Sequence, residues 1–236
     1  MESKIPTLAD LQKFSVNRAG QSEVIRQSLY DHLLYPTAGI TQLNFFQQPA
    51  GQGNTTASGV AAGSAKSLAD TNMTLAGQLA APVNQIVESI EVSIEPGSVS
   101  TANTFTLSSP VTFVAAAAVT ALAHLSDVNA LRQTGYLRFY IGSKDYLQEA
   151  PIGRFPAKCS FDLEGSISTN SATVGEVSFS RAAPGGRPYY MEPPVSLFSG
   201  QNFTVSLNWP AVVATPSGFN ARLGVILDGY QFRNSQ

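Results

Sequence analysis

Two acidic residues, Asp162 and Glu164, form the pair in this sequence whose type and spacing could do chemistry. They lie two positions apart on an expected strand, so both carboxylates project from one face about 7 Å apart. That separation is compatible with the paired acids of glycoside hydrolysis. The same positions also continue an ordinary polar face with Lys158 and Ser160, and no run of exposed aromatic residues accompanies them for sugar stacking. The sequence therefore favours a solvated strand face over a pair of catalytic acids.

Other residues that commonly carry chemistry are few. The two histidines, His32 and His124, are fewer than the cluster of ligands that a histidine-based metal centre needs. The single cysteine, Cys159, alternates with large apolar residues, which is typical of an inert inward-facing thiol. The Gly-Gln-Gly stretch at 51–53 lacks a third glycine, and no serine elbow or phosphate-binding loop is present. We therefore predict no catalytic, cofactor-binding or metal site, no small-molecule substrate and no enzymatic activity.

Length and composition predict one large β-domain with a neutral surface. A chain of 236 residues suits a single all-β domain. Charged residues make up 13% of it, against about 25% in ordinary soluble domains. A net charge of −2 provides no broad positive field, so we expect no strong direct binding to nucleic acid. A surface of this kind fits a subunit that faces its neighbours, and it equally fits a secreted lectin or adhesin module.

The cellular compartment is predicted from two further features. One cysteine cannot build a disulfide framework, and the start Met-Glu-Ser-Lys lacks the basic and apolar regions of a secretory signal. The longest apolar stretch, from Val111 to Ala123, is shorter than the ~20 residues that a membrane span needs. We therefore expect folding in a reducing cytoplasm and no transmembrane segment.

Residues 1–40 are predicted to form an N-terminal arm. Apolar residues up to position 35 have spacings that fit one or two short helices, and Pro36 ends the pattern. Those residues are Leu8, Leu11, Phe14, Val24, Ile25, Leu29, Leu33 and Leu34. Four basic and four acidic residues balance in the arm, so it is no genome-binding tail. It packs either on a neighbour or on its own domain. We expect deletion of residues 1–35 to leave the sandwich folded but to impair assembly.

Residues 41–236 are predicted to form an antiparallel β-sandwich of about eight strands. A Gly/Ala/Ser-rich stretch, 48–67, is typical of a flexible loop. An Ala-rich segment from about Val114 to Arg132 is predicted to form one inserted helix, and its start fits a buried strand as well. Alternating apolar residues indicate the strands. These strands cover Gln42 to Gln47, Ile86 to Glu95 (broken at Glu88), Thr104 to Leu107, Leu137 to Ile141, Cys159 to Leu163, Val177 to Phe179, Tyr189 to Leu197, Phe203 to Trp209 and Leu223 to Leu227. The intervening Gly165 to Asn170 reads as a turn-rich segment.

Two clusters have the composition of contact surfaces. Arg187 to Pro194 combines prolines with Tyr, Met and Arg, the types enriched at protein interfaces. Tyr140 to Pro156 contains Lys144, Asp145, Tyr146, Arg154 and Phe155 and could act similarly. Each cluster could equally pack its aromatic residues within its own domain. The contact elements that we predict are the arm, the loop at 48–67 and Arg187 to Pro194.

The chain resembles the jelly-roll major capsid proteins of tailless icosahedral bacteriophages and viruses over residues 40 to 233. Three features carry the resemblance: the arm and small-residue loop, the block from Thr71 to Leu79 that leads into the strand at Ile86, and the closing strand from Leu223 to Tyr230. The resemblance implies a single jelly roll, since a tandem form would need a longer chain. It also implies a structural shell protein whose arm reaches under or across its neighbours.

The implied partners are other copies of the chain and other capsid proteins, and the implied location is the virion, assembled in the host cytoplasm. The neutral arm departs from the basic arms of small RNA-virus coats. That departure favours a shell around an internal membrane, or one with a separate packaging protein. The alternative is a carbohydrate- or receptor-binding β-sandwich module of a spike or fibre. A glycosidase or lyase that uses Asp162 and Glu164 ranks third.

Overall fold

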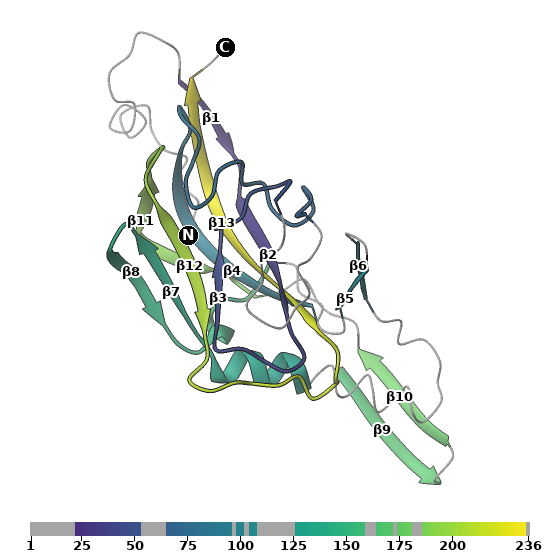
Figure 1. The fold of residues 1–236 in the computed structure, drawn as a ribbon. Helices are drawn as coiled ribbons and strands as arrows, with labels where there is room; N and C mark the ends of the chain where they lie inside the picture. The colour runs from purple at the N-terminus through teal and green to yellow at the C-terminus, as the bar shows by residue number, and fades with distance from the viewer. Residues whose placement is uncertain are drawn as a thin grey trace.

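The computed structural model describes residues 22–52, 65–95, 98–101, 104–107, 126–158, 164–171, 174–180 and 186–234. Most of these residues lie in β-strands, and the two main sheets face each other (Figure 1). Every strand pair within the described ranges is antiparallel. The predicted antiparallel β-sandwich is therefore confirmed.

Five strands of the described residues form what we call the large sheet. They are β1 (Ser22–Arg26), β2 (Leu29–Tyr35), β4 (Asn84–Glu95), β11 (Tyr189–Leu197) and β13 (Ala221–Asn234). Their order is β1, β13, β4, β11, and β2 also pairs with β13. Strands β1 and β2 follow each other along one edge of β13, because β1 pairs with its last residues and β2 with its first.

Four strands of the described residues form what we call the small sheet. They are β3 (Gln42–Phe45), β7 (Tyr136–Ile141), β8 (Lys144–Glu149) and β12 (Phe203–Asn208). Their order is β3, β12, β7, β8. Both β8 and β11 end their sheets on the same side of the sandwich (Figure 1).

Two hairpins lie outside the main sheets. They are built from β5 (Ser98–Thr101) with β6 (Thr104–Leu107) and from β9 (Glu164–Ser171) with β10 (Val174–Ser180). The β9–β10 hairpin reaches away from the sandwich, and the shorter β5–β6 hairpin lies on the same side (Figure 1). The prediction of a turn-rich segment at Gly165 to Asn170 was wrong, because these residues lie in β9. Their alternation is of small and polar residues, which period-two apolar patterning does not detect.

The strand pairing is nested along the chain. Strand β2 pairs with β13, β3 with β12, β4 with β11, and β7 with β8. Two further ladders join these pairs into sheets. Strand β4 pairs with β13 in the large sheet, and β7 pairs with β12 in the small sheet. Connections between these nested partners therefore pass repeatedly from one sheet to the other.

The core lies between the two sheets. Inward residues of the large sheet, such as Val92 and Val225, are buried. They belong to one apolar cluster with small-sheet residues such as Phe139, Val205 and Leu207. Because successive side chains of a strand point to opposite faces, the alternation in the sequence specifies this inward set.

Helical structure covers one end of the sandwich. Residues 126–134 form the C-terminal part of the predicted Ala-rich helix, whose N-terminal part lies outside the described residues. The buried Asp127 carboxylate accepts a hydrogen bond from the Ser217 N–H at 2.9 Å. The Trp209 indole N–H donates to the Leu131 carbonyl at 3.3 Å. The helix is therefore fixed to the connection between β12 and β13. A 3₁₀ turn, η1 (Ile152–Arg154), follows β8.

The prediction of a helical arm was wrong for residues 22–35, which form β1 and β2. The inward positions of β2 are Leu29, Asp31, Leu33 and Tyr35, and all four are buried. A charged residue at an inward position hides the period of two and leaves spacings that also fit a helix. Residues 1–21 of the predicted arm lie outside the described residues.

One other prediction changes with this finding. Deletion of residues 1–35 would remove β2, which pairs with β13 from Leu29 to Tyr35, so the sandwich is not expected to survive it.

The predicted loop at 48–67 is described only at its ends. There, Gly51 N–H donates to the Lys66 carbonyl at 2.8 Å and Lys66 N–H to the Gln52 carbonyl at 2.7 Å.

A β-bulge in β4 explains why the alternation breaks at Glu88. The register with β13 shifts between Asp228 and Gly229, which leaves Glu88 as the extra residue. Val87 takes the core position, and Ile86 moves out of the core cluster. A Cβ at Gly229 would lie 1.8 Å from the Ile86 carbonyl oxygen. The bulge therefore requires glycine at this position.

We predict that Gly229→Ala destabilises the fold by about 1–3 kcal/mol or more, because backbone must move to admit the methyl group. Urea unfolding measures the change. Gly153→Ala is the matched control, since its Cβ would meet Arg132 only at ordinary contact distance, 3.8 Å. Equal stability of the Gly229 variant and the wild type would contradict this account of the bulge.

Candidate contact surface

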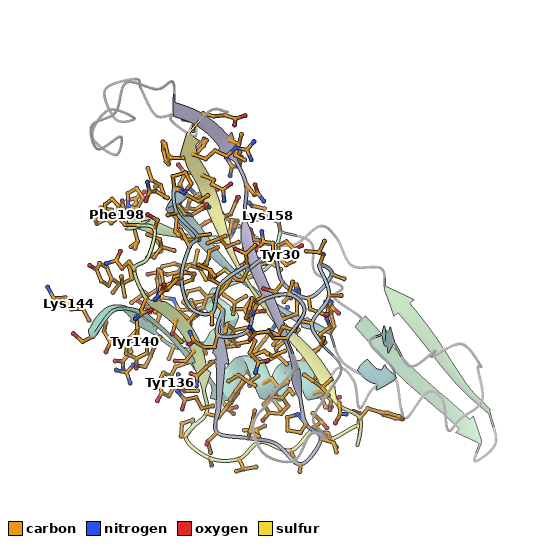
Figure 2. All side chains as sticks on the ribbon, turned by 45° about the horizontal axis from the view of Figure 1, so that its top comes forward. Tyr30, Tyr136, Tyr140, Lys144, Lys158 and Phe198 are labelled. Atoms are coloured by element: carbon orange, nitrogen blue, oxygen red, sulfur yellow. The ribbon has the colours of Figure 1, made fainter. Side chains whose placement is uncertain are left out.

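The outer face of the small sheet carries a row of aromatic and cationic side chains on β7. Tyr136, Arg138 and Tyr140 occupy alternate positions and are half-buried, while the residues between them are buried in the core. The sequence Tyr-Leu-Arg-Phe-Tyr-Ile therefore places Tyr and Arg outward by the same period that places apolar residues inward. Tyr136 and Tyr140 lie on the opposite side of the sandwich from Tyr30 and Lys158 (Figure 2).

The strand register extends this row across the sheet. Three cross-strand rows form what we call the small-sheet face: Gln42, Asn208 and Tyr136; Asn44, Ser206, Arg138 and Gln148; and Thr204, Tyr140 and Asp145. Apart from the Arg138 and Asp145 charges, its members are neutral polar or tyrosine residues. Ser206 and Asn208 are buried within this face. Its accessible members are Tyr and Arg among Thr, Asn and Gln, a composition similar to that of protein-binding surfaces.

Contacts within the small-sheet face hold its side chains in place. Arg138 Nη2 lies 2.5 Å from Asp145 Oδ2, and the guanidinium carbon lies 4.6 Å from the centre of the Tyr140 ring. Burial raises the pKa of the Tyr140 hydroxyl, which therefore stays protonated at neutral pH. An exposed ion pair of this kind adds little stability. The paired Arg138 does orient the Tyr140 ring, which lowers the entropic cost of ordering this side chain when a partner binds.

The structure brings the two predicted contact clusters together at the β8–β11 side. The Tyr189 and Phe155 rings lie 4.8 Å apart, and the Arg154 guanidinium lies 5.8 Å from the Tyr189 ring. Arg154 also pairs with Glu149, which accepts a 3.5 Å hydrogen bond from the Tyr189 hydroxyl. Phe155 is fully buried, so this part of both clusters packs within its own domain.

Other members of the same clusters point outward. Tyr146 is 49% exposed and Tyr190 is 47% exposed. The Arg187 guanidinium lies 5.2 Å from the Tyr190 ring. Strand β11 is interrupted beside it by Pro193 and Pro194, where its register with β4 shifts. Prolines and a shift of this kind protect an edge strand from pairing, so contact here would use side chains rather than backbone.

The outer face of the large sheet carries an ionic group that we call the Asp228 cluster. Asp228 Oδ2 accepts from Arg26 Nη2 at 2.7 Å and from Lys158 Nζ. Lys158 Nζ also lies 3.1 Å from Glu91 Oε1, and its backbone N–H donates to the same carboxylate at 2.8 Å. Glu88 lies 4.0 Å from Arg26. The carboxylates of Asp228 and Glu91 are buried beneath these half-exposed cations, so the cluster satisfies its own charges.

The pKa values of this cluster follow from its contacts. Burial alone would raise the pKa of Asp228, but hydrogen bonds from Lys158 and Arg26 lower it on balance. At Lys158, burial lowers the pKa of the ammonium group, but hydrogen bonds to Asp228 and Glu91 raise it on balance. Glu88 behaves in the opposite sense to Asp228, because burial raises its pKa more than Arg26 lowers it.

The residues considered for catalysis do not form a described site. Asp162, Cys159 and His124 lie outside the described residues. His32 is on the outer face of β2, where its Nδ1 lies 3.2 Å from the Asp70 carbonyl oxygen. Burial, and then Arg222, lower its pKa. Among the residues that the structure describes, no three His, Cys, Asp or Glu side chains could hold a metal ion together.

In the ranges that the structure describes, no helix is long and apolar enough to cross a membrane. Comparisons of the chain with models of known families, with curated proteins and with solved structures returned no match.

We predict that Asp228→Asn lowers the free energy of unfolding at neutral pH by roughly 1–3 kcal/mol, since it weakens two charge-assisted hydrogen bonds. Because the pKa of Asp228 is lowered in the fold, its contribution is present above the ordinary value of 3.8 and disappears as pH falls through the lowered pKa. The stability difference from wild type should therefore shrink in acid, as urea unfolding across pH would show.

Glu23→Gln is the matched control, because Glu23 forms an exposed pair with Arg233 between β1 and β13. Exposed pairs contribute little, so this variant should resemble the wild type at neutral pH. A difference between Asp228→Asn and wild type that is the same at every pH would rule out the electrostatic explanation.

Proposed function

We propose that this chain is a structural capsid protein whose β-sandwich is a jelly roll that tiles an icosahedral shell. The observation that carries the proposal is the nested strand pairing. Jelly rolls are double sheets of eight strands with two Greek keys, and they occur in viral capsid and lectin domains. The four nested pairs contain eight strands, which lie in two layers of four. One layer has the order β2, β13, β4, β11 and the other β3, β12, β7, β8, and β1 extends the first layer beside β2.

The surface chemistry supports a role in association. The small-sheet face is nearly neutral and rich in tyrosine and amide side chains, and its one ion pair is internal. Such a face loses little hydration of charge when a neighbour covers it. Repeated contacts of modest strength accumulate in a closed shell, so a single contact need not be strong.

The hairpins support the same role. An isolated two-stranded hairpin is marginally stable in water. The β9–β10 hairpin pairs with no other strand of the described residues and reaches away from the sandwich (Figure 1). A neighbouring subunit would supply the contacts that such a projecting element needs. The proposed partners are thus other copies of this chain and other shell proteins, in a virion assembled in the host cytoplasm, with or without an internal membrane.

Assembly of the purified, untagged chain tests the proposal directly. Light scattering on a sizing column and negative-stain microscopy, across salt and protein concentration, should reveal trimers, pentamers, hexamers or closed particles. A monomer at every condition contradicts the proposal. If that monomer binds glycans on an array, the carbohydrate-binding alternative takes its place.

A double variant, Tyr136→Ser with Tyr140→Ser, tests the small-sheet face. Both rings are outward, so the fold should persist while assembly at a given concentration falls at least tenfold, which corresponds to a loss of about 1.4 kcal/mol. Circular dichroism verifies the fold and light scattering measures assembly. The control is Val212→Ser, which removes an exposed apolar side chain from the connection between β12 and β13. Equal impairment of the two variants would contradict the assignment of contact to this face.

A further inference from the structure

A lysine and an aspartate meet inside the sandwich. Lys66 Nζ lies 2.5 Å from Asp31 Oδ1, and the exposed fractions of the two side chains are 1% and 0%. Asp31 points inward from β2 between Leu29 and Leu33, two members of the apolar core. An ion pair removed from water to this extent is costly unless its geometry compensates. The proximity and burial bring an amine and a carboxyl carbon together where water is excluded.

Two hydrogen-bond donors complete the surroundings of Asp31. The Phe46 N–H donates to Asp31 Oδ2 at 2.6 Å, and the Thr71 side chain also hydrogen-bonds to Asp31. The Thr71 hydroxyl oxygen accepts from the Met73 N–H at 3.2 Å, which leaves its proton directed elsewhere. The carboxyl group thus has the Phe46 donor on Oδ2 and the Lys66 amine on Oδ1.

Phe46, which makes this contact, has a strained backbone. Its φ is +67°, in the left-handed region that a bulky side chain rarely adopts, and its ring is fully buried. Strain of this kind is retained when the surrounding structure enforces it, and it clusters at sites with a chemical role. The strained residue is the one whose N–H donates to the carboxyl group.

We propose that Asp31 and Lys66 join in an intramolecular amide bond that forms after folding. A proton passes from the ammonium to the carboxylate, which gives a neutral amine and a carboxylic acid. The Nζ lone pair attacks Cγ of Asp31, and the carbonyl electrons move onto the oxygen held by Phe46. Collapse of this intermediate breaks one C–O bond. The departing hydroxyl takes a proton from the attacking nitrogen, and the products are an amide and one water molecule.

The environment favours each step. Burial raises the pKa of the Asp31 carboxyl despite the nearby Lys66, so the neutral acid that nucleophilic attack requires is accessible. The Phe46 N–H is placed to stabilise negative charge on the carbonyl oxygen, as preorganised backbone donors do in acyl transfer. Fixing the amine against the carboxyl carbon supplies the proximity that makes a slow condensation feasible. The reaction needs no other reagent.

The bond would join β2 of the large sheet to residues 66–72, the segment that runs along the outer edge of β2. That segment already pairs with β2 through the His32 N–H and the Asp70 carbonyl at 2.7 Å, and through the Tyr30 N–H and the Asn72 side chain at 3.0 Å. Phe46 follows β3 of the small sheet, so the cross-link would fix the side of the sandwich where β2 and β3 meet. This inference does not depend on the proposed capsid function.

The intact mass of the purified full chain, measured after denaturation, tests the proposal. The mass should be lower than that calculated from the sequence by one water molecule. Peptide mapping should find Asp31 and Lys66 joined, with no tryptic cleavage after Lys66. A folded protein with the full calculated mass overturns the proposal, whatever any variant does.

Variants locate the reaction. Lys66→Arg keeps the positive charge but removes the amine nucleophile, so this chain should show the full calculated mass. The control Lys144→Arg, at the exposed start of β8, should lose one water as the wild type does. Loss of water that persists in Lys66→Arg would come from another reaction and would contradict the proposed bond.

Discussion

The antiparallel ladder between β4 and β13 is the constraint on which both sheets depend. These strands have 12 and 14 residues, and they pair from Glu95 opposite Arg222 to Asn84 opposite Phe232. The far edge of β13 receives β1 and β2, and the far edge of β4 receives β11, so this ladder decides the order of the large sheet. Its inward residues complete the core against the small sheet. Its bulge at Glu88 decides which side chains face outward on either side of it.

Much of this arrangement could be predicted, because a strand with one buried face must alternate. The predicted segments at Thr104 to Leu107 and Tyr189 to Leu197 coincide with β6 and β11. The failure at β2 has a specific cause, since Asp31 stands where the pattern requires an apolar residue. Its partner Lys66 is distant in sequence and lies in a stretch whose composition reads as a loop. A buried charge pair is therefore invisible to any method that equates polarity with exposure.

The residue types of the candidate contact surface could be predicted from the sequence, but the direction of each side chain could not. The sequence identified segments rich in Tyr and Arg, yet Tyr189 packs inward on Phe155 while its neighbour Tyr190 is exposed. Only the strand register separates two such adjacent residues, and the shift near Pro193 makes that register unreadable from alternation alone. The row on β7 could have been found, because it is the outward complement of an inward set that the sequence had already specified.

The two outer faces of the sandwich differ in how their polar groups are satisfied. On the large sheet, the charged groups of the Asp228 cluster pair with one another. These ion pairs connect β1 and Lys158 to the β4–β13 ladder. On the small-sheet face, the Arg138–Asp145 ion pair lies among neutral polar and tyrosine side chains. A face whose charges are already paired gains little binding free energy from a partner. A neutral polar face can exchange hydrogen bonds to water for hydrogen bonds to a neighbour's amides and hydroxyls at small net cost. Of these two described faces only the small-sheet face has this property, which would give the proposed association a defined orientation, as a shell built from heterologous contacts requires.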